Sequence, residues 1–282
     1  MASTYLTRLT VLRVEDVGPA MRRVVLGGPE LADVVARWSG HTDAYVKIAF
    51  LAPGVDYPER LDLEQVRASM PPEHWPVLRT YTIRRLDPAA GEMWIDVVVH
   101  GDAGLAGPWA ARAQAGETVH LRGPGGAYRP DPAADHQLLV GDESALPAVL
   151  ASLEALEPGQ RATAFLEVDG PADEQPVVTA GDAEVFWLHR SPADAGTTSL
   201  LDDAVRAWSW PAGRVQVFVH GESGLLKTVR PYLVKDRGVE RRDVSISAYW
   251  RRGESEEGFR AWKASERARG EEPMIRPESA PS

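Results

Sequence analysis

Short runs of β-favouring hydrophobic residues, interrupted by turns such as Gly18-Pro19, fill the first half of the chain. One helix is predicted among them, over Leu105–Ala113. The predicted strands are Leu6–Val14, Met21–Leu26, Ala44–Phe50, Arg79–Arg84, Met93–His100 and Thr118–Arg122. Several short strands separated by turns indicate a small antiparallel β-barrel.

The second half alternates strands with helices, which predicts right-handed crossovers and a parallel sheet covered on both faces. The predicted elements are strands His136–Val140, Thr163–Val168, Val185–His189, Val215–His220 and Val244–Tyr249, and helices Ala148–Leu156, Leu200–Trp208 and one from Gly224. The domain boundary is expected near Tyr128–Asp135. Pro231 is expected to kink or restart the helix that contains it, because proline lacks the backbone donor. The end, Gly253–Ser282, is expected to hold a charged helix, Glu254–Arg269, and a tail disordered at its tip.

The composition is that of an ordinary globular protein, with 282 residues, 44% hydrophobic and 26% charged. There are no cysteines, which excludes disulfides, cysteine-ligated zinc, iron–sulfur clusters and covalently attached c-type haem. Any redox chemistry in this chain therefore needs an organic cofactor. The seven histidines include no pair at metal-ligand spacing, so no metal site in the protein is expected.

The net charge of −10 argues against a general nucleic-acid or anionic-membrane binder, because both partners select basic surfaces. The first fifteen residues lack the pattern of a secretory signal, and no stretch reaches the ~18 apolar residues of a membrane span. We therefore expect a soluble cytoplasmic protein without membrane insertion.

The segment Arg79–Arg84 carries the most chemistry. On a strand, Arg79 and Tyr81 share one face, while Thr80, Thr82 and Arg84 share the other. An aromatic ring beside an arginine and hydroxyl donors suits a flat cofactor with an anionic tail; the alternative is a half-solvated surface strand. Downstream, small residues between Gly104 and Trp109 begin a helix, where backbone N–H groups favour a pyrophosphate, although a plain turn explains them equally.

The order of these segments resembles the siderophore-interacting proteins, ferric-siderophore reductases of the ferredoxin–NADP reductase-like superfamily. The resemblance spans about residues 5 to 265. The strings that carry it are Arg79–Arg84, His100-Gly101, Gly104–Trp109, Gly123-Pro124, Gly141-Asp142-Glu143-Ser144-Ala145-Leu146-Pro147, Val219-His220-Gly221-Glu222 and Tyr249-Trp250-Arg251-Arg252-Gly253.

The resemblance implies an FAD-binding barrel over residues 1–130, an NAD(P)H-binding α/β domain over 131–252, and a C-terminal helix and flexible tail over 253–282. It implies that Arg79 holds the FAD phosphates, that Tyr81 lies against the flavin and that Thr82 sits near flavin N5. The implied pyrophosphate and adenine contacts are His100, Gly104, Ala106 and Trp109. The nicotinamide cleft is implied at Gly141, Asp142, Glu143 and Ser144, with both acids shaping the cleft or binding ribose.

The family binds its anionic substrate, a ferric siderophore, through basic residues around the flavin. Lys47 matches one such position, and Arg122, Arg251 and Arg252 are further candidates. Two positions depart from the family: Gly125 stands where a basic residue is usual, and Gly107 where a hydroxyl residue is usual. Arg122 could replace the missing charge, although as a strand neighbour of position 125 its side chain need not point the same way.

The expected function is FAD-dependent NAD(P)H:ferric-siderophore reduction that releases Fe(II), with electron transfer through the flavin and no catalytic protein residue. The loss of charge at Gly125 supports an alternative, a flavin reductase that feeds a ferredoxin or another redox partner. A non-catalytic siderophore-binding protein is a third possibility. The donor stays open: Glu167 and Asp169 favour NADH, whereas Arg190 and the arginines near Arg241 suit the 2′-phosphate of NADPH, which the family more often uses.

Overall fold

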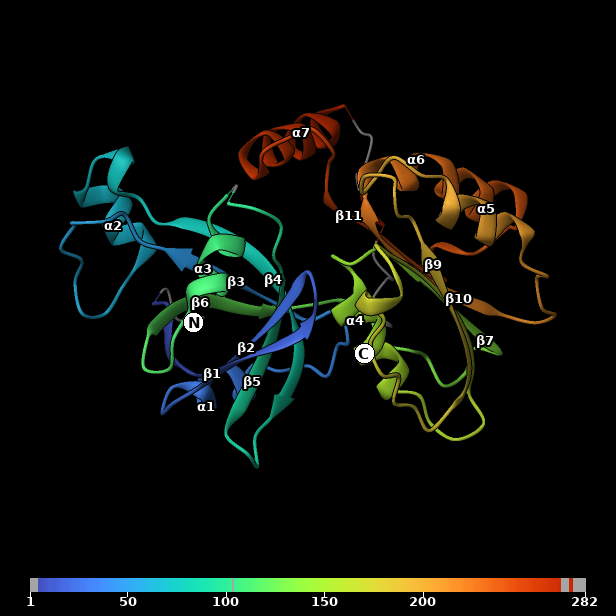
Figure 1. Cartoon of the computed structure of the whole chain (residues 1–282), viewed down its shortest axis with the longest axis horizontal. Helices are drawn as coiled ribbons and strands as arrows, with labels where there is room; N and C mark the ends of the chain where they lie inside the picture. Colours follow the sequence, from blue (N-terminus) through green and yellow to red (C-terminus); the bar gives the residue numbers. More distant parts are fainter. Residues whose placement is uncertain (1–4, 103, 270–273, 276–282) are drawn as a thin grey trace. The chain divides into compact units, whose positions relative to one another are not determined.

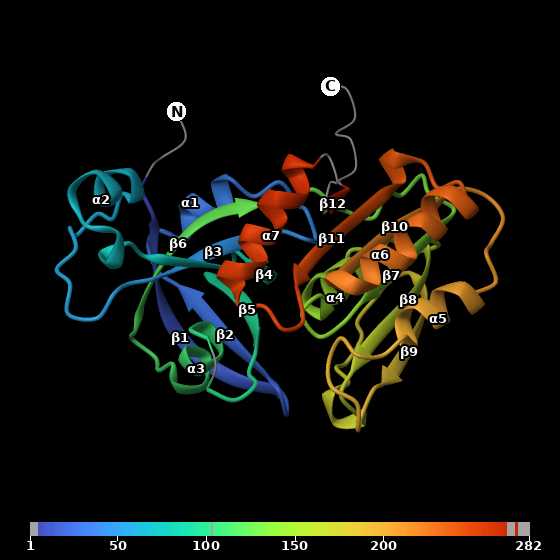
Figure 2. The same cartoon turned by 90° about the horizontal axis from the view of Figure 1, so that it is seen from above.

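The computed structural model describes residues 5–102, 104–269 and 274–275 (Figures 1 and 2). These residues form two compact units. The first contains the chain up to residue 40 together with residues 44–126, and the second contains residues 41–43 and the chain from 127 on. No helix in the described residues is long and apolar enough to cross a membrane.

The first unit is a closed antiparallel barrel with the strand order β1-β2-β5-β4-β3-β6. Pairing of Thr7–Thr10 on β1 with Thr118–Leu121 on β6 closes it. The strands are β1 (Thr7–Gly18), β2 (Met21–Gly27), β3 (Tyr45–Phe50), β4 (Val77–Asp87), β5 (Glu92–Val98) and β6 (Thr118–Gly125). The helices are α1 (Leu31–Ala36), α2 (Leu63–Ser69) and α3 (Ala106–Arg112).

Alternate residues of the strands fill the barrel interior, where Val46 and Ile48 of β3 pack with Ile83 and Ile95. Burial of one face of every strand is what fixes the register, because a slip of one residue would turn this set outward. Helices α1 and α2 were not predicted from the sequence. Each is short, and α2 buries only Leu63 and Val66, so neither has the repeated apolar pattern that identifies a helix.

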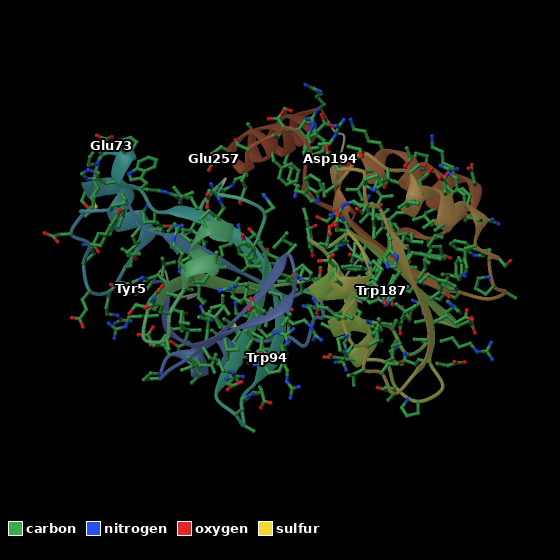
Figure 3. The ribbon with its side chains drawn as sticks, viewed as in Figure 1. Tyr5, Glu73, Trp94, Trp187, Asp194 and Glu257 are labelled. Atoms are coloured by element: carbon green, nitrogen blue, oxygen red, sulfur yellow. The ribbon has the colours of Figure 1, made fainter. Side chains whose placement is uncertain are left out.

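A buried ion pair joins β2 to β5. Asp96, 4% exposed, accepts two hydrogen bonds from the Arg23 guanidinium at 2.7 and 2.8 Å. Arg84 Nε lies 4.0 Å from the same carboxylate. The Arg23 guanidinium also lies over the ring of Trp94, labelled in Figure 3, at 4.7 Å from its centre. The carboxylate therefore compensates buried positive charge within the barrel wall.

The second unit is a six-stranded sheet with the order β12-β11-β10-β7-β8-β9. Its first five strands along the chain are parallel to one another, and β12 pairs antiparallel with β11. The strands are β7 (His136–Gly141), β8 (Arg161–Val168), β9 (Asp182–His189), β10 (Val215–Glu222), β11 (Val244–Trp250) and β12 (Met274–Ile275). The helices are α4 (Leu146–Glu154), α5 (Leu200–Ala207), α6 (Ser223–Pro231) and α7 (Glu256–Ala268).

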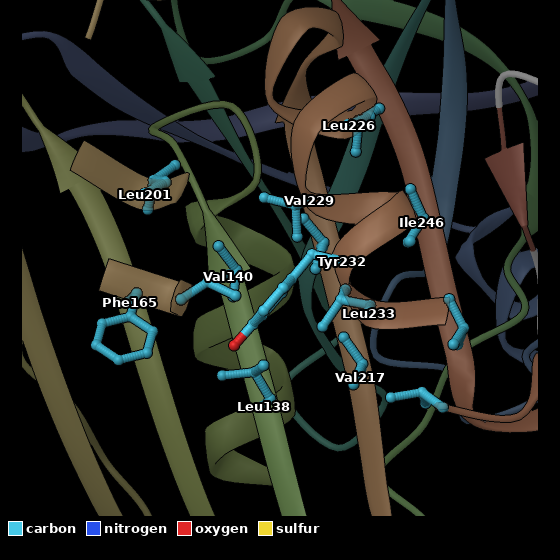
Figure 4. Packing of buried hydrophobic residues seen from close by; sticks show 14 of the residues in the cluster. Leu138, Val140, Phe165, Leu201, Val217, Leu226, Val229, Tyr232, Leu233 and Ile246 are labelled. Carbon is cyan, nitrogen blue, oxygen red and sulfur yellow. The ribbon is translucent and has the colours of Figure 1, made fainter. Parts of the chain in front are cut away.

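Helices cover both faces of this sheet. Leu138 and Val140 of β7 pack in one core with Leu201 of α5 and Val229 of α6 (Figure 4). Gly141 faces the other way, since a Cβ placed on it would lie 2.6 Å from Ala145 Cβ and 3.6 Å from Val149 of α4. Figure 1 shows α4 on the side of the sheet opposite to α5 and α6. The predicted fold class, an antiparallel barrel followed by a parallel α/β sheet, is confirmed.

The helix that contains Pro231 behaves as the sequence predicted. Helix α6 ends at Pro231, and the chain continues as one π-helical turn over Tyr232–Asp236. Helix α7 is more than a solvated end: Phe259 is 5% exposed and belongs to the core of the α/β unit. The Lys263 ammonium donates to the carbonyl of Ala248 on β11. The predicted disordered tip of the tail lies outside the described residues.

Substituting Asp96→Asn should lower the free energy of unfolding by about 3–5 kcal/mol, because it leaves buried arginine charge uncompensated. Urea unfolding followed by circular dichroism measures this change. Glu240→Gln is the matched control, since Glu240 pairs with Arg242 where both side chains are more than half exposed, and it should leave the free energy of unfolding unchanged. A loss below about 1 kcal/mol for Asp96→Asn would show that the pair contributes little.

Candidate functional site

Strand β4 presents its predicted residues on two faces. Its pairing with β3 sets Tyr81 opposite Val46 and Arg79 opposite Ile48, while Thr80 lies opposite Lys47 and Thr82 opposite Tyr45. Residues opposite each other on adjacent strands project to the same side. Arg79 and Thr82 are buried, at 7% and 6% exposure, and Tyr81 is half-buried. The predicted alternation is confirmed up to Thr82; beyond it, the register shifts between Ile83 and Arg85.

Lys47 and Arg122 form a cationic row on one face of the barrel wall. Lys47 lies directly opposite Arg122 on β6 and opposite Thr80 on β4, so all three side chains project to the same side. In the described part of the chain neither cation forms an ion pair. Two like charges directly opposite each other destabilise a sheet, and an anion bound beside them would remove that repulsion.

The Tyr45 ring of the neighbouring strand fills the space beside Gly125. It pairs with Tyr45, and a Cβ built on it would lie 2.8 Å from Cζ and Oη of the Tyr45 ring. A basic side chain at position 125 therefore needs the Tyr45 ring to move. Among the residues described on β3 and β6, the lysine and arginine charges of this face come from Lys47 and Arg122.

The turn between His100 and Trp109 combines an exposed loop with a packed helix start. Gly101 and Gly104 have φ of +56° and +80°, a region that residues with a Cβ rarely adopt. His100 is exposed, Ala106 is buried, and the Trp109 ring meets Phe50 edge-on at 5.8 Å. A Cβ on Gly107 would lie 3.4 Å from the carbonyl oxygen of Val98, so the usual hydroxyl residue would need only a small adjustment here.

In the α/β unit, the chain reverses its direction across the sheet between β7 and β10. Strands β8 and β9 follow on one side of β7, and β10 and β11 on the other. Open parallel sheets bind ligands at the carboxyl ends of the strands at such a switch point. The four predicted residues Gly141, Asp142, Glu143 and Ser144 follow β7 at this point, so the structure brings them together with the end of β10.

Asp142 joins the ends of three strands through its buried carboxylate. Oδ1 accepts hydrogen bonds from the Ser144 amide at 2.9 Å and the Ser144 hydroxyl at 2.5 Å. Oδ2 accepts from the Glu222 amide, after β10, at 2.9 Å and from Trp250 Nε1, at the end of β11, at 2.7 Å. Burial raises the pKa of Asp142, and these four donors oppose the rise. Both oxygens of Asp142 therefore already accept two hydrogen bonds each from protein groups.

Glu143 forms a second cluster, toward the other side of β7. Its Oε1 accepts from Arg190 Nη1 at 2.5 Å and from the Asp169 amide at 3.0 Å, while Arg190 Nη2 lies 3.5 Å from Asp169 Oδ1. Burial raises the pKa of Glu143, and the Arg190 charge opposes this. Nearby Glu167 accepts from the Thr198 hydroxyl at 2.7 Å, and burial raises its pKa as well.

The prediction of site residues missed Glu222 and Trp250. Glu222 caps α6 through the Gly224 amide and accepts from the Arg252 amide at 3.1 Å, which ties the β10 and β11 ends together. Both residues stand in strings that carry the family resemblance, and that was the available signal. Arg251 lies over the Trp262 ring at 5.0 Å, so its charge is directed at α7 of its own unit. Groups of three or more possible metal ligands are not found among the described residues.

Two family models together match most of the chain. Residues 10–128 match the siderophore-interacting FAD-binding domain, and residues 134–253 match the siderophore-interacting protein model. A ferric vibriobactin reductase of Vibrio cholerae is 32% identical over 262 residues, 90% of this chain and 93% of the relative. The chain belongs to the siderophore-interacting protein family. The resemblance predicted from motif order and the prediction of FAD as a cofactor are both confirmed.

Other members of the siderophore-interacting protein family match over similar lengths. An uncharacterised protein of Mycobacterium tuberculosis is 45% identical over 93% of this chain and 96% of its own length. The NADPH-dependent ferric-chelate reductase of Escherichia coli is 28% identical over 86% of this chain and 91% of its own length. The crystal structure of a siderophore utilization protein from T. fusca is 39% identical and covers 89% of this chain and 94% of that one, with a TM-score of 0.75.

The fold extends beyond this family. Phthalate dioxygenase reductase superposes with a TM-score of 0.57 at 15% identity, over 86% of this chain and 68% of that one. At this identity the similarity concerns the fold alone. It agrees with the predicted fold class, an antiparallel barrel followed by a parallel α/β sheet.

Proposed function

We propose that this chain is an FAD-dependent NAD(P)H:ferric-siderophore reductase that releases iron as Fe(II) in the cytoplasm. The observation that carries the proposal is the cationic row of Lys47 and Arg122. It lies on the barrel of an FAD-binding domain, on the same face as Thr80 and Thr82 of β4, and no carboxylate of the described residues neutralises it. Such a row fits an anionic substrate.

The proposed reaction balances with two equivalents of iron. Each NAD(P)H gives up a hydride, which is one proton and two electrons, and each ferric ion accepts one electron. One NAD(P)H and two ferric chelates therefore yield NAD(P)⁺, one proton, two ferrous ions and the freed chelators. Reduction promotes release because hard oxygen donors hold Fe(II) more weakly than Fe(III). FAD, when bound, accepts electrons in a pair and passes them on singly.

The residues of the barrel fit FAD by their chemistry. Arg79 offers a buried guanidinium for the phosphates, Tyr81 a half-buried ring for the flavin face, and Thr82 a hydroxyl for the flavin edge. The turn with His100, Gly104, Ala106 and Trp109 offers backbone donors and an aromatic surface for the pyrophosphate and adenine. These assignments remain proposals, supported by the family match over residues 10–128.

The ends of the parallel strands fit a nicotinamide nucleotide. Gly141 and Gly221 leave no room for a side chain, since a Cβ on Gly221 would lie 2.7 Å from Asp142 Oδ2. The chain can therefore turn closely at the switch point, and Asp142 holds the turns in place. Ser144 and Glu143 stand at its rim. Of the two arginines at the end of β11, Arg252 is proposed to add positive charge for the chelate, whereas the Arg251 guanidinium lies over the Trp262 ring of α7.

Replacing Arg79 should reduce the retention of FAD. In Arg79→Ala the buried cation that faces the phosphates is lost, and a charge-assisted hydrogen bond of this kind contributes about 1.5–3 kcal/mol. The ratio of flavin to protein absorbance after gel filtration measures retention. Arg85→Ala, which removes an exposed arginine of the same strand paired with Asp87, is the control and should keep its flavin. Full flavin occupancy in Arg79→Ala would overturn the assignment of Arg79.

Lys47→Ala and Arg122→Ala should each raise KM for a trianionic ferric catecholate by about five- to tenfold. Flavin content should not change, because neither residue is assigned to FAD. A neutral ferric hydroxamate should be affected much less, since charge is what the row recognises. Formation of Fe(II), followed with a ferrous-specific chromophore, gives the rates, and Lys235→Ala, an exposed lysine at the end of the π-helical turn, is the control.

The same assay separates the other candidate functions. Reduction of all chelates at equal rates, unaffected by both substitutions, would favour a flavin reductase that serves a ferredoxin or another redox partner. Bound FAD that NAD(P)H fails to reduce would favour a non-catalytic siderophore-binding protein.

A further inference from the structure

The ends of β7, β8 and β9 carry far more negative than positive charge. The residues at and after these ends, 141–145, 167–175 and 189–199, are all described. They contain seven carboxylates but one arginine, Arg190, and one histidine. This is the edge of the sheet at which the proposed function places the nicotinamide nucleotide. The single guanidinium therefore decides whether a 2′-phosphate is tolerated there.

Arg190 already forms ion pairs with Glu143 and Asp169. Its side chain is 10% exposed and that of Glu143 is 12% exposed, with 2.5 Å between Nη1 and Oε1. Its second amino group faces Asp169 at 3.5 Å, and its buried Nε has no hydrogen-bond partner in the described residues. A phosphate that recruited this guanidinium would have to displace a buried carboxylate, which leaves that carboxylate unpaired at a large cost.

The other arginines considered for a 2′-phosphate lie at the wrong end of the sheet. Arg241 belongs to a short turn, Arg241–Asp243, that precedes β11. It therefore lies at the amino end of a parallel strand, whereas the nucleotide site is at the carboxyl ends. Arg214, which precedes β10, pairs with Asp131 and Asp243 at the same amino end.

Asp169 is an exposed carboxylate directly after β8 that a ribose can reach. Its side chain is 53% exposed, in contrast to Glu143 and Glu167. Its backbone is fixed from both sides, because its amide donates to Glu143 at 3.0 Å and its carbonyl accepts from the Ser191 amide at 3.0 Å. A carboxylate at the end of the second parallel strand is suited to accept hydrogen bonds from ribose hydroxyls.

We propose that Asp169 binds the adenosine ribose hydroxyls and that the Glu143–Arg190 pair excludes a 2′-phosphate, so that this chain uses NADH in preference to NADPH. The inference rests on the proposed function, in which a nicotinamide nucleotide binds at this edge. A 2′-phosphate brings about two negative charges, which Glu143, Glu167 and Asp169 repel. A hydroxyl at the same place carries none and donates to Asp169. The preference for NADH over NADPH thus combines attraction of the ribose hydroxyl by Asp169 with repulsion of the 2′-phosphate by the carboxylates.

The test compares 5′-ADP with 2′,5′-ADP as probes, by isothermal titration calorimetry on the full-length FAD-loaded protein. The wild type should bind 5′-ADP at least about tenfold more tightly than 2′,5′-ADP. Asp169→Asn should weaken 5′-ADP binding and narrow this gap. Glu143→Gln combined with Asp169→Asn releases Arg190, and should reverse the preference. Asp182→Asn removes the same charge at the amino end of β9, and should leave both affinities unchanged.

A second readout keeps this inference separable from the proposed function. Anaerobic flavin reduction should show a larger kcat/KM for NADH than for NADPH in the wild type. Faster reduction by NADPH, with 2′,5′-ADP bound at least as tightly as 5′-ADP, would overturn the NADH preference and leave the reductase function standing. If neither probe binds and neither nucleotide reduces the flavin, both proposals fail.

Discussion

The buried carboxylate of Asp142 holds the carboxyl ends of the parallel strands together in the α/β unit. Three strand ends that are remote in sequence, after β7, β10 and β11, converge on its two oxygens through Ser144, Glu222 and Trp250. Burial alone disfavours a charged carboxylate, and the four hydrogen bonds donated to Asp142 stabilise its charge in this buried position. The close turns at Gly141 and Gly221, the capping of α6 by Glu222 and the position of the β11 end all depend on this junction.

A different constraint governs the barrel, where strand register decides which charges meet. The pairing of β3 with both β4 and β6 sets Lys47 between Thr80 and Arg122. The Tyr45 ring fills the space in which a side chain at position 125 would lie, so glycine fits this position. The cations proposed to bind the chelate and the groups proposed to bind FAD therefore lie on one set of hydrogen-bonded strands. At the ends of β7, β8 and β9 the charge balance is reversed: residues 141–145, 167–175 and 189–199 contain seven carboxylates and one arginine, Arg190.

The sequence predicted the strands well because their hydrophobic runs are strong and are bounded by glycine and proline. It missed α1 and α2, whose few buried residues leave no helical period. It placed Gly141, Asp142, Glu143 and Ser144 together because they are consecutive. It identified Lys47 and Arg122 as candidates but did not show that they lie opposite each other on adjacent strands. That relation is a matter of register, which no local pattern encodes. Likewise, the sequence offered Arg190 and Arg241 as partners for a phosphate. The structure pairs Arg190 with Glu143 and Asp169, and it places Arg241 at the amino end of β11.

The most direct test of the account is the absorption spectrum of the purified protein under anaerobic conditions, recorded before and after addition of NADH and again after a ferric catecholate. The account predicts a flavin band that bleaches on addition of the nucleotide and returns when the chelate is added, with Fe(II) formed in a ratio of two per nucleotide oxidised. Absence of a flavin band after incubation with FAD, or a bleached band that the chelate does not restore, would contradict it.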